Sequence, residues 1–181
     1  MSGRALLMMV VMAMLCMALA GTARAGFMAG PIWANDYWNV DKVDYPYRGY
    51  TNDGQYARIW GDNSLNYAHV DYSFGSSLLS DPNVYITGIS VTIRAYAPTA
   101  NGLTVQLIDN GTVRGPSLGA SWGHWIADVT ATQYGNNGWT PAKLNTNRFR
   151  VRLTNQDNNE DVYVDSVSVK IYYAYGCVTT G

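Results

Sequence analysis

Residues 149–153 read Phe149-Arg150-Val151-Arg152-Leu153, and this strict alternation of apolar and basic side chains decides the fold class. Successive side chains of a β-strand point to opposite faces of a sheet. The pattern therefore predicts a strand whose apolar face lies on a core and whose arginines lie outside. An amphipathic helix would instead repeat its apolar side chains every three or four residues.

The next segment also alternates, but its apolar parity switches once. Its apolar positions are Val162, Val164, Val167, Val169, Ile171 and Tyr173. One extra residue at Asp165-Ser166, which is a β-bulge, would keep all of these side chains on the core side.

We expect these two segments to pair with each other as a hairpin. This pairing places Arg152 beside Tyr163 and Arg150 near Asp165, so the outer face would be a paired, solvated one. The three basic residues Arg148, Arg150 and Arg152 also allow an alternative interpretation, in which this face binds an anionic polymer.

Further alternating segments occur at 68–74, 89–95 and 103–107, and a weaker one occurs at 125–130. Asn110-Gly111 is a strong hairpin signal, because both central residues of a type I′ turn need positive φ. One helical turn is expected near 142–144, after Trp139-Thr140-Pro141. Twelve of the 13 acidic residues are Asp, which suits turns better than helices. These features predict an all-β, antiparallel two-sheet β-sandwich over residues 51–175.

Residues 1–25 have the pattern of a secretory signal peptide. Arg4 precedes the uncharged apolar run Ala5–Ala20, and Ala23-Arg24-Ala25 has the small residues of a cleavage site. The run is shorter than the roughly 20 residues of a membrane span. We therefore expect a secreted or cell-surface protein with no membrane span in its mature chain. Residues 26–50 are expected to form an aromatic-rich, irregular arm or edge strand, and 176–181 a C-terminal tail.

Several segments resemble, in their order, a jelly-roll domain that recurs in exported bacterial surface proteins and some phage structural proteins. The matching segments are 86–93, 104–107, Trp139-Thr140-Pro141-Ala142, 149–153 and 163–173, with Asn52-Asp53-Gly54 before the first long strand. The resemblance implies a two-sheet jelly roll and no catalytic residues. Lys143 stands where the family usually has an acid, so any role of that acid does not carry over.

Charge and catalytic motifs exclude several classes of function. The mature chain would carry a net charge of −3, which is too mild to predict binding to nucleic acid or to an anionic membrane. Glu160 is the only Glu and lies in a polar turn, and His69 and His124 are the only histidines. We therefore predict no catalytic residues and no enzyme. A polysaccharide hydrolase or lyase stays open as an alternative.

Calcium is the one cofactor that the residues suggest. Asp157, Asn159 and Asp161 gather hard oxygen ligands in one turn, and Asp53 offers another. A solvated turn is the competing interpretation, since the spacing does not fit an EF-hand loop.

Aromatic residues give the remaining candidates. Trp122, His124, Trp125 and Trp60 are candidates for stacking on sugar rings. Trp33, Trp38 and the only mature cysteine, Cys177, are candidates for intermolecular contact.

The sequence thus favours an exported, non-enzymatic β-sandwich that acts by surface contact. It would be a component of a cell-surface or extracellular assembly, either self-associating or bound to another surface protein, with the N-terminal arm adding to a neighbour's sheet edge. The alternative is a carbohydrate-binding module with exposed Trp and Tyr side chains, a polysaccharide ligand and a structural calcium ion.

Overall fold

The computed structural model describes residues 26–61, 68–75, 78–79, 81–98, 101–135, 137–146, 148–155 and 160–175. The expected signal peptide (1–25), the C-terminal tail with Cys177, and the calcium candidates Asp157 and Asn159 lie outside these residues.

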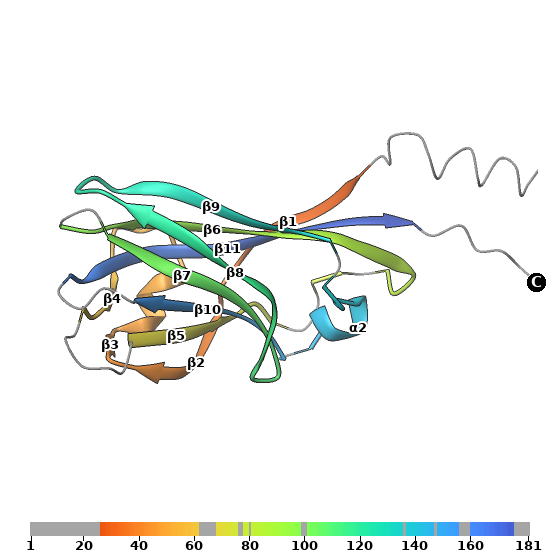
Figure 1. Ribbon diagram of the computed structural model, residues 1–181, viewed down its shortest axis with the longest axis horizontal. Helices are drawn as coiled ribbons and strands as arrows, with labels where there is room; N and C mark the ends of the chain where they lie inside the picture. Colours follow the sequence, from red (N-terminus) through yellow and green to blue (C-terminus); the bar gives the residue numbers. More distant parts are fainter. Residues whose placement is uncertain are drawn as a thin grey trace, which may run out of the picture.

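The described chain is built almost entirely of strands, and its two antiparallel sheets lie against each other (Figure 1). The strands are β1 (Phe27–Trp33), β2 (Asp36–Asp41), β3 (Val43–Asp44), β4 (Ala57–Ile59), β5 (Ala68–Ser73), β6 (Val84–Tyr96), β7 (Asn101–Asp109), β8 (Thr112–Trp122), β9 (Ala127–Tyr134), β10 (Phe149–Asn155) and β11 (Val162–Tyr175). Two short helical turns, η1 (Pro46–Gly49) and α2 (Pro141–Leu144), complete it. The six-stranded sheet has the order β3-β4-β11-β6-β9, with β1 also paired to β11, and the five-stranded sheet has the order β2-β5-β10-β7-β8.

Side-chain parity along the strands builds the core between the sheets, as predicted. Phe149, Val151 and Leu153 of β10 are fully buried, and so are the apolar residues of β11 from Val162 to Ile171. The pairing of β11 with β6 shifts register between Val164 and Ser166, which confirms the bulge at Asp165.

Two local predictions are also confirmed. Asn110 and Gly111 both have positive φ in the turn between β7 and β8. The helical turn α2 forms after Thr140, whose side chain accepts a hydrogen bond from the backbone N–H of Lys143.

The predicted hairpin between 149–153 and 162–171 is wrong. β10 lies in the five-stranded sheet between β5 and β7, whereas β11 lies in the six-stranded sheet beside β6. Alternation specifies which face of a strand is buried, but two strands on opposite sides of one core satisfy it equally well. Arg152 therefore meets Asp71 rather than Tyr163, and Asp165 pairs with Arg94 rather than Arg150.

Residues 26–50 are not an irregular arm but form strands in both sheets, and β2 and β3 are edge strands, which was the other expectation for this segment. β1 pairs with β11, β3 pairs with β4, and β2 pairs with β5. Positive φ at Lys42 and Tyr45 turns the chain after β2 and after β3, and positive φ at Asn39 falls in the register shift within β2. The strands are short and mostly exposed, so they lack the long alternation that marks a strand in the sequence.

Tyr72 ties the N-terminal segment to the core and gives the fold a pH dependence. Its ring is fully buried, and its hydroxyl donates a hydrogen bond of 3.1 Å to the backbone oxygen of Pro46. Burial raises the pKa of Tyr72 above its ordinary value, and the negative charge of Tyr50 would raise it further.

We expect stability to fall as the pH rises above about 10, where tyrosines of the unfolded chain lose their protons and Tyr72 in the folded chain keeps its own. The folded state then binds more protons than the unfolded state, so alkaline pH favours unfolding. Urea unfolding of wild type and Tyr72→Phe at pH 8 and pH 11 measures this effect. The variant should lose less stability between the two pH values; an equal loss in both proteins would contradict the assignment.

Candidate functional site

An aromatic stripe crosses one end of the outer face of the six-stranded sheet. It consists of Trp60, Arg58, Tyr163, Tyr96 and Tyr56. Arg58 on β4, Tyr163 on β11 and Tyr96 on β6 are neighbours across three adjacent strands. Alternation places them outside, because the residues flanking them on each strand are buried.

Two tyrosines form the centre of the stripe. The rings of Tyr96 and Tyr163 stack with centroids 4.9 Å apart and planes 10° apart, and Tyr56 meets Tyr96 edge-on at 5.1 Å. Burial raises the pKa of Tyr96, and its tyrosine neighbours raise it further. The Tyr96 hydroxyl is therefore protonated at neutral pH and can both donate and accept hydrogen bonds.

Trp60 forms one end of the stripe, with a charged group held against its ring. The Arg58 guanidinium lies 4.1 Å from the ring centroid, and its Nη2 atom is 2.6 Å from the Asp161 carboxylate. Asp44 lies 3.9 Å from the same guanidinium. Trp60 is 39 % exposed, so it presents both apolar ring surface and fixed polar groups to solvent.

The loop between β8 and β9 adjoins the other end of the stripe. The backbone N–H of Ala97, next to Tyr96, donates to the Gly123 oxygen over 3.1 Å. His124 Nδ1 is 3.3 Å from the backbone oxygen of Pro98, and its ring meets Trp125 edge-on at 5.3 Å. Trp125 is 81 % exposed, more than any other large hydrophobic side chain in the described part of the protein.

The structure thus places three of the four predicted sugar-binding residues, Trp60, His124 and Trp125, at this end. For the fourth residue, Trp122, the prediction of an exposed sugar-binding ring is wrong. Its ring is only 4 % exposed and packs in the core, and its indole N–H donates to the Ala127 oxygen over 3.1 Å. The parity of β8 turns Trp122 inward, whereas Trp125 lies beyond the strand.

The calcium candidates that the structure describes have other partners. Asp161 accepts hydrogen bonds from Arg58 and from the backbone N–H of Gly61. Asp53 accepts from Thr51 and from the backbone of Gln55, and its own N–H donates to Asp165. Among the described residues, no three His, Cys, Asp or Glu side chains gather as a metal site would require.

The two tryptophans proposed for intermolecular contact lie on different sheets. Trp33 ends β1 of the six-stranded sheet, and Trp38 lies on β2 of the five-stranded sheet. Both are about half exposed, but Trp38 carries the Arg150 guanidinium 4.7 Å from its ring centroid. The structure therefore does not join them into one contact surface.

Sequence reasoning missed four residues as parts of a site: Tyr56, Arg58, Tyr96 and Tyr163. Alternation in 89–96 does place Tyr96 outside the core, and alternation in 162–164 does the same for Tyr163. Nothing in the spacing shows that these two strands are neighbours, and that adjacency creates the stripe.

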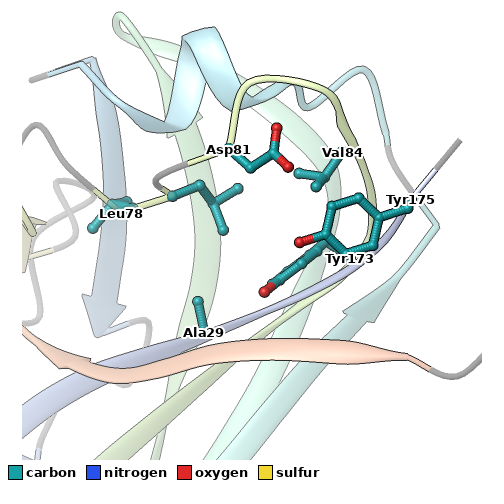
Figure 2. Close-up of a pocket in the computed structure, with 7 residues that line it drawn as sticks. Ala29, Leu78, Asp81, Val84, Tyr173 and Tyr175 are labelled. Atoms are coloured by element: carbon teal, nitrogen blue, oxygen red, sulfur yellow. The ribbon is translucent and has the colours of Figure 1, made fainter.

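A small pocket lies at the opposite end of β11 from the stripe (Figure 2). It is lined by Ala29, Leu78, Leu79, Asp81, Val84, Tyr173 and Tyr175. Among the described residues that line this pocket, Asp81 is the only Asp, Glu, Lys, Arg or His. Separately, no helix in the described residues is long and apolar enough to cross a membrane.

The sequence matches no protein-family model and no curated protein. Similar solved structures include a CBM4 module at 14 % identity and a TM-score of 0.46, covering 77 % of this chain and 95 % of that one. A family 35 carbohydrate-binding module from Clostridium thermocellum has 13 % identity and a TM-score of 0.43, with 81 % and 97 % covered. The carbohydrate-binding module CBM36 in complex with calcium and xylotriose has 15 % identity and a TM-score of 0.35, with 82 % and 98 % covered. These three solved structures are carbohydrate-binding modules.

Proposed function

We propose that this protein binds a neutral polysaccharide on the aromatic stripe and the adjoining Trp125 loop, without chemical change to the sugar. One observation carries the proposal. Two exposed indole rings lie near a stacked tyrosine pair at one end of the six-stranded sheet: Trp60 in the stripe itself, and Trp125 in the loop that hydrogen-bonds beside Tyr96.

The chemistry of this surface suits a sugar chain. The C–H face of a pyranose ring packs against an indole or phenol ring, and its hydroxyl groups need hydrogen-bond partners at the ring edges. Tyr96, Tyr163 and Arg58 supply such partners beside the rings. The carboxylates of Asp44 and Asp161 disfavour an acidic sugar here, because like charges repel.

This function is favoured over a role as an assembly component. That role included an N-terminal arm free to add to a neighbour's sheet edge, but β1 and β2 pair with β11 and β5 of the chain itself. Export, the jelly-roll resemblance to bacterial surface and phage proteins, and a calcium ion stay predictions. Residues 1–25 support export, since they have the features of a signal peptide.

Trp125→Ala and Trp60→Ala are each expected to weaken binding by about tenfold, the effect of an aromatic hot spot worth roughly 1.4 kcal/mol. Titration calorimetry against soluble xylan, galactan, mannan and β-glucan, together with tryptophan fluorescence, measures this. Trp33→Ala is the matched control, because Ser168, its partner on β11, is five residues from Tyr163, or about 16 Å along the strand.

If Trp60→Ala and Trp125→Ala both bind the glycan as the wild type does, or if Trp33→Ala loses as much affinity as they do, the ligand binds elsewhere. No response to any of these glycans, combined with a concentration-dependent dimer in light scattering, would favour the assembly role instead.

A further inference from the structure

A second surface, on the outer face of the five-stranded sheet, has the opposite charge character. Arg150 and Arg152 of β10 alternate with core residues and so point away from the core. Arg148 precedes them, and Trp38 of β2 lies beside Arg150. We call Trp38, Arg148, Arg150 and Arg152 the arginine face.

Only one of these three arginines is matched by its own carboxylate. Arg152 donates to both oxygens of Asp71, with Nε–Oδ1 at 2.6 Å and Nη2–Oδ2 at 2.9 Å. This two-point pairing neutralises Arg152 and holds it in place. Arg152 therefore has no unpaired positive charge with which to bind a ligand.

Arg150 has no carboxylate within ion-pair distance in the described part of the chain. Its guanidinium lies over Trp38, and its Nε is buried without a hydrogen-bond partner. Asp36 is at the same level of the sheet but two strands away, roughly 10 Å. The charge of Arg150 is therefore uncompensated at short range.

Arg148 shares one carboxylate with two other cations. Asp109, which is 1 % exposed, lies 3.2 Å from Arg148, 3.0 Å from Arg114 and 3.9 Å from the ammonium group of Lys143. None of these three cations has another ion pair in the described residues. One cation is enough to neutralise the buried Asp109 carboxylate. The other two of these three cations therefore leave an excess of positive charge around it.

From this imbalance we infer that the arginine face binds an acidic saccharide, whose carboxylate or sulfate group binds Arg150 beside Trp38. The Arg150 guanidinium reaches toward β2, where it lies over Trp38, whereas Arg148 lies in the turn before β10 and reaches Asp109 on β7. Arg150 is therefore the residue that contacts the oxyanion, and Arg148 adds positive charge at the same end of the sheet. Guanidinium groups bind planar or tetrahedral oxyanions through paired hydrogen bonds. The half-exposed Trp38 ring offers a stacking surface for the sugar next to that anionic group.

A saccharide fits this surface better than a nucleic acid does. The whole chain has a net charge of −1, and the cations described above gather at one end of the five-stranded sheet. Binding to nucleic acid depends on neutralising many closely spaced phosphates, for which this patch is too small. The inference is independent of the aromatic stripe, which lies on the other sheet.

The inference is tested by measuring the binding of three polysaccharides to the whole protein at 150 mM salt: polygalacturonate, chondroitin sulfate and neutral dextran. Comparison of the first two shows whether a carboxylate or a sulfate group is recognised. We expect one or both polyanions to bind and dextran not to bind. Arg150→Gln should weaken that binding at least tenfold, and Arg148→Gln, which removes a nearby charge without removing the contact, should weaken it by a smaller factor. Lys170→Gln, which removes a positive charge from the other sheet, should change it less than twofold.

Trp125→Ala should leave polyanion binding unchanged. The outcome for the arginine face is therefore distinguishable from the outcome for the proposed binding of a neutral polysaccharide at the aromatic stripe. Arg148 is half exposed, so its variant should keep the wild-type melting temperature and circular dichroism. Absence of binding to both polyanions, an equal loss in Lys170→Gln, or tighter binding of single-stranded DNA than of either polysaccharide would overturn the inference.

Discussion

Replacing Arg152 by alanine is expected to lower the free energy of unfolding by about 3–5 kcal/mol. Asp71, its partner, is 1 % exposed, and both of its carboxylate oxygens accept hydrogen bonds from Arg152. The variant leaves this carboxylate buried without its cation, and a stranded buried charge costs more than the lost contact itself. Urea unfolding at pH 7, followed by tryptophan fluorescence, gives the value.

Double-mutant cycles with Arg152→Ala test the sheet assignment directly. With Asp71→Ala, the coupling energy should exceed about 1.5 kcal/mol, because the two side chains form one hydrogen-bonded pair. With Tyr163→Ala, the effects should add to within roughly 0.5 kcal/mol, since Tyr163 lies on the outer face of the other sheet. A strong coupling energy between Arg152 and Tyr163 would indicate that β10 and β11 pair as a hairpin and would contradict the fold.

The second large effect is expected in the core. Phe149→Ala should lower the free energy of unfolding by about 3–5 kcal/mol, through lost burial and the cavity that remains. The Phe149 ring is fully buried, meeting Trp139 edge-on at 5.2 Å and Phe74 at 5.7 Å. Chemical and thermal unfolding measure the loss.

Tyr85→Ala is the matched control for Phe149→Ala. It also removes an aromatic ring from a strand, but that ring is 64 % exposed, so the change should stay within about 0.5 kcal/mol. A loss below about 1 kcal/mol for Phe149→Ala would mean that this end of the sandwich is not closed by the aromatic cluster.

Local chemistry let several features be predicted from single stretches of the chain. Phe149, Val151 and Leu153 had to share one face, because a strand has a period of two. The parity switch at Asp165 required one extra residue, which is the β-bulge. The structure shows which contacts the side chain of this extra residue makes. The buried Asp165 carboxylate accepts hydrogen bonds from the backbone N–H groups of Asp53 and Gly54 and pairs with Arg94.

The candidate site was predictable only in part, and Trp122 and Trp125 show why. The two tryptophans are three residues apart in an aromatic stretch, and their residue types are identical. One ends inside the core and the other is almost fully exposed, because β8 ends between them. A weakly patterned segment does not reveal where its strand ends, so both were predicted to be exposed.

The sequence by itself determined the fold class and the inward or outward direction of the side chains on strands that alternate clearly, such as β10 and β11, since both follow from backbone geometry and burial within a few residues. Only the tertiary structure decided which strands are neighbours. Hydrogen bonding between strands is the same for any pair of sequences, so the choice of partner depends on how the whole core closes. That choice put Tyr96 beside Tyr163 and Arg150 beside Trp38, and so created both proposed binding surfaces.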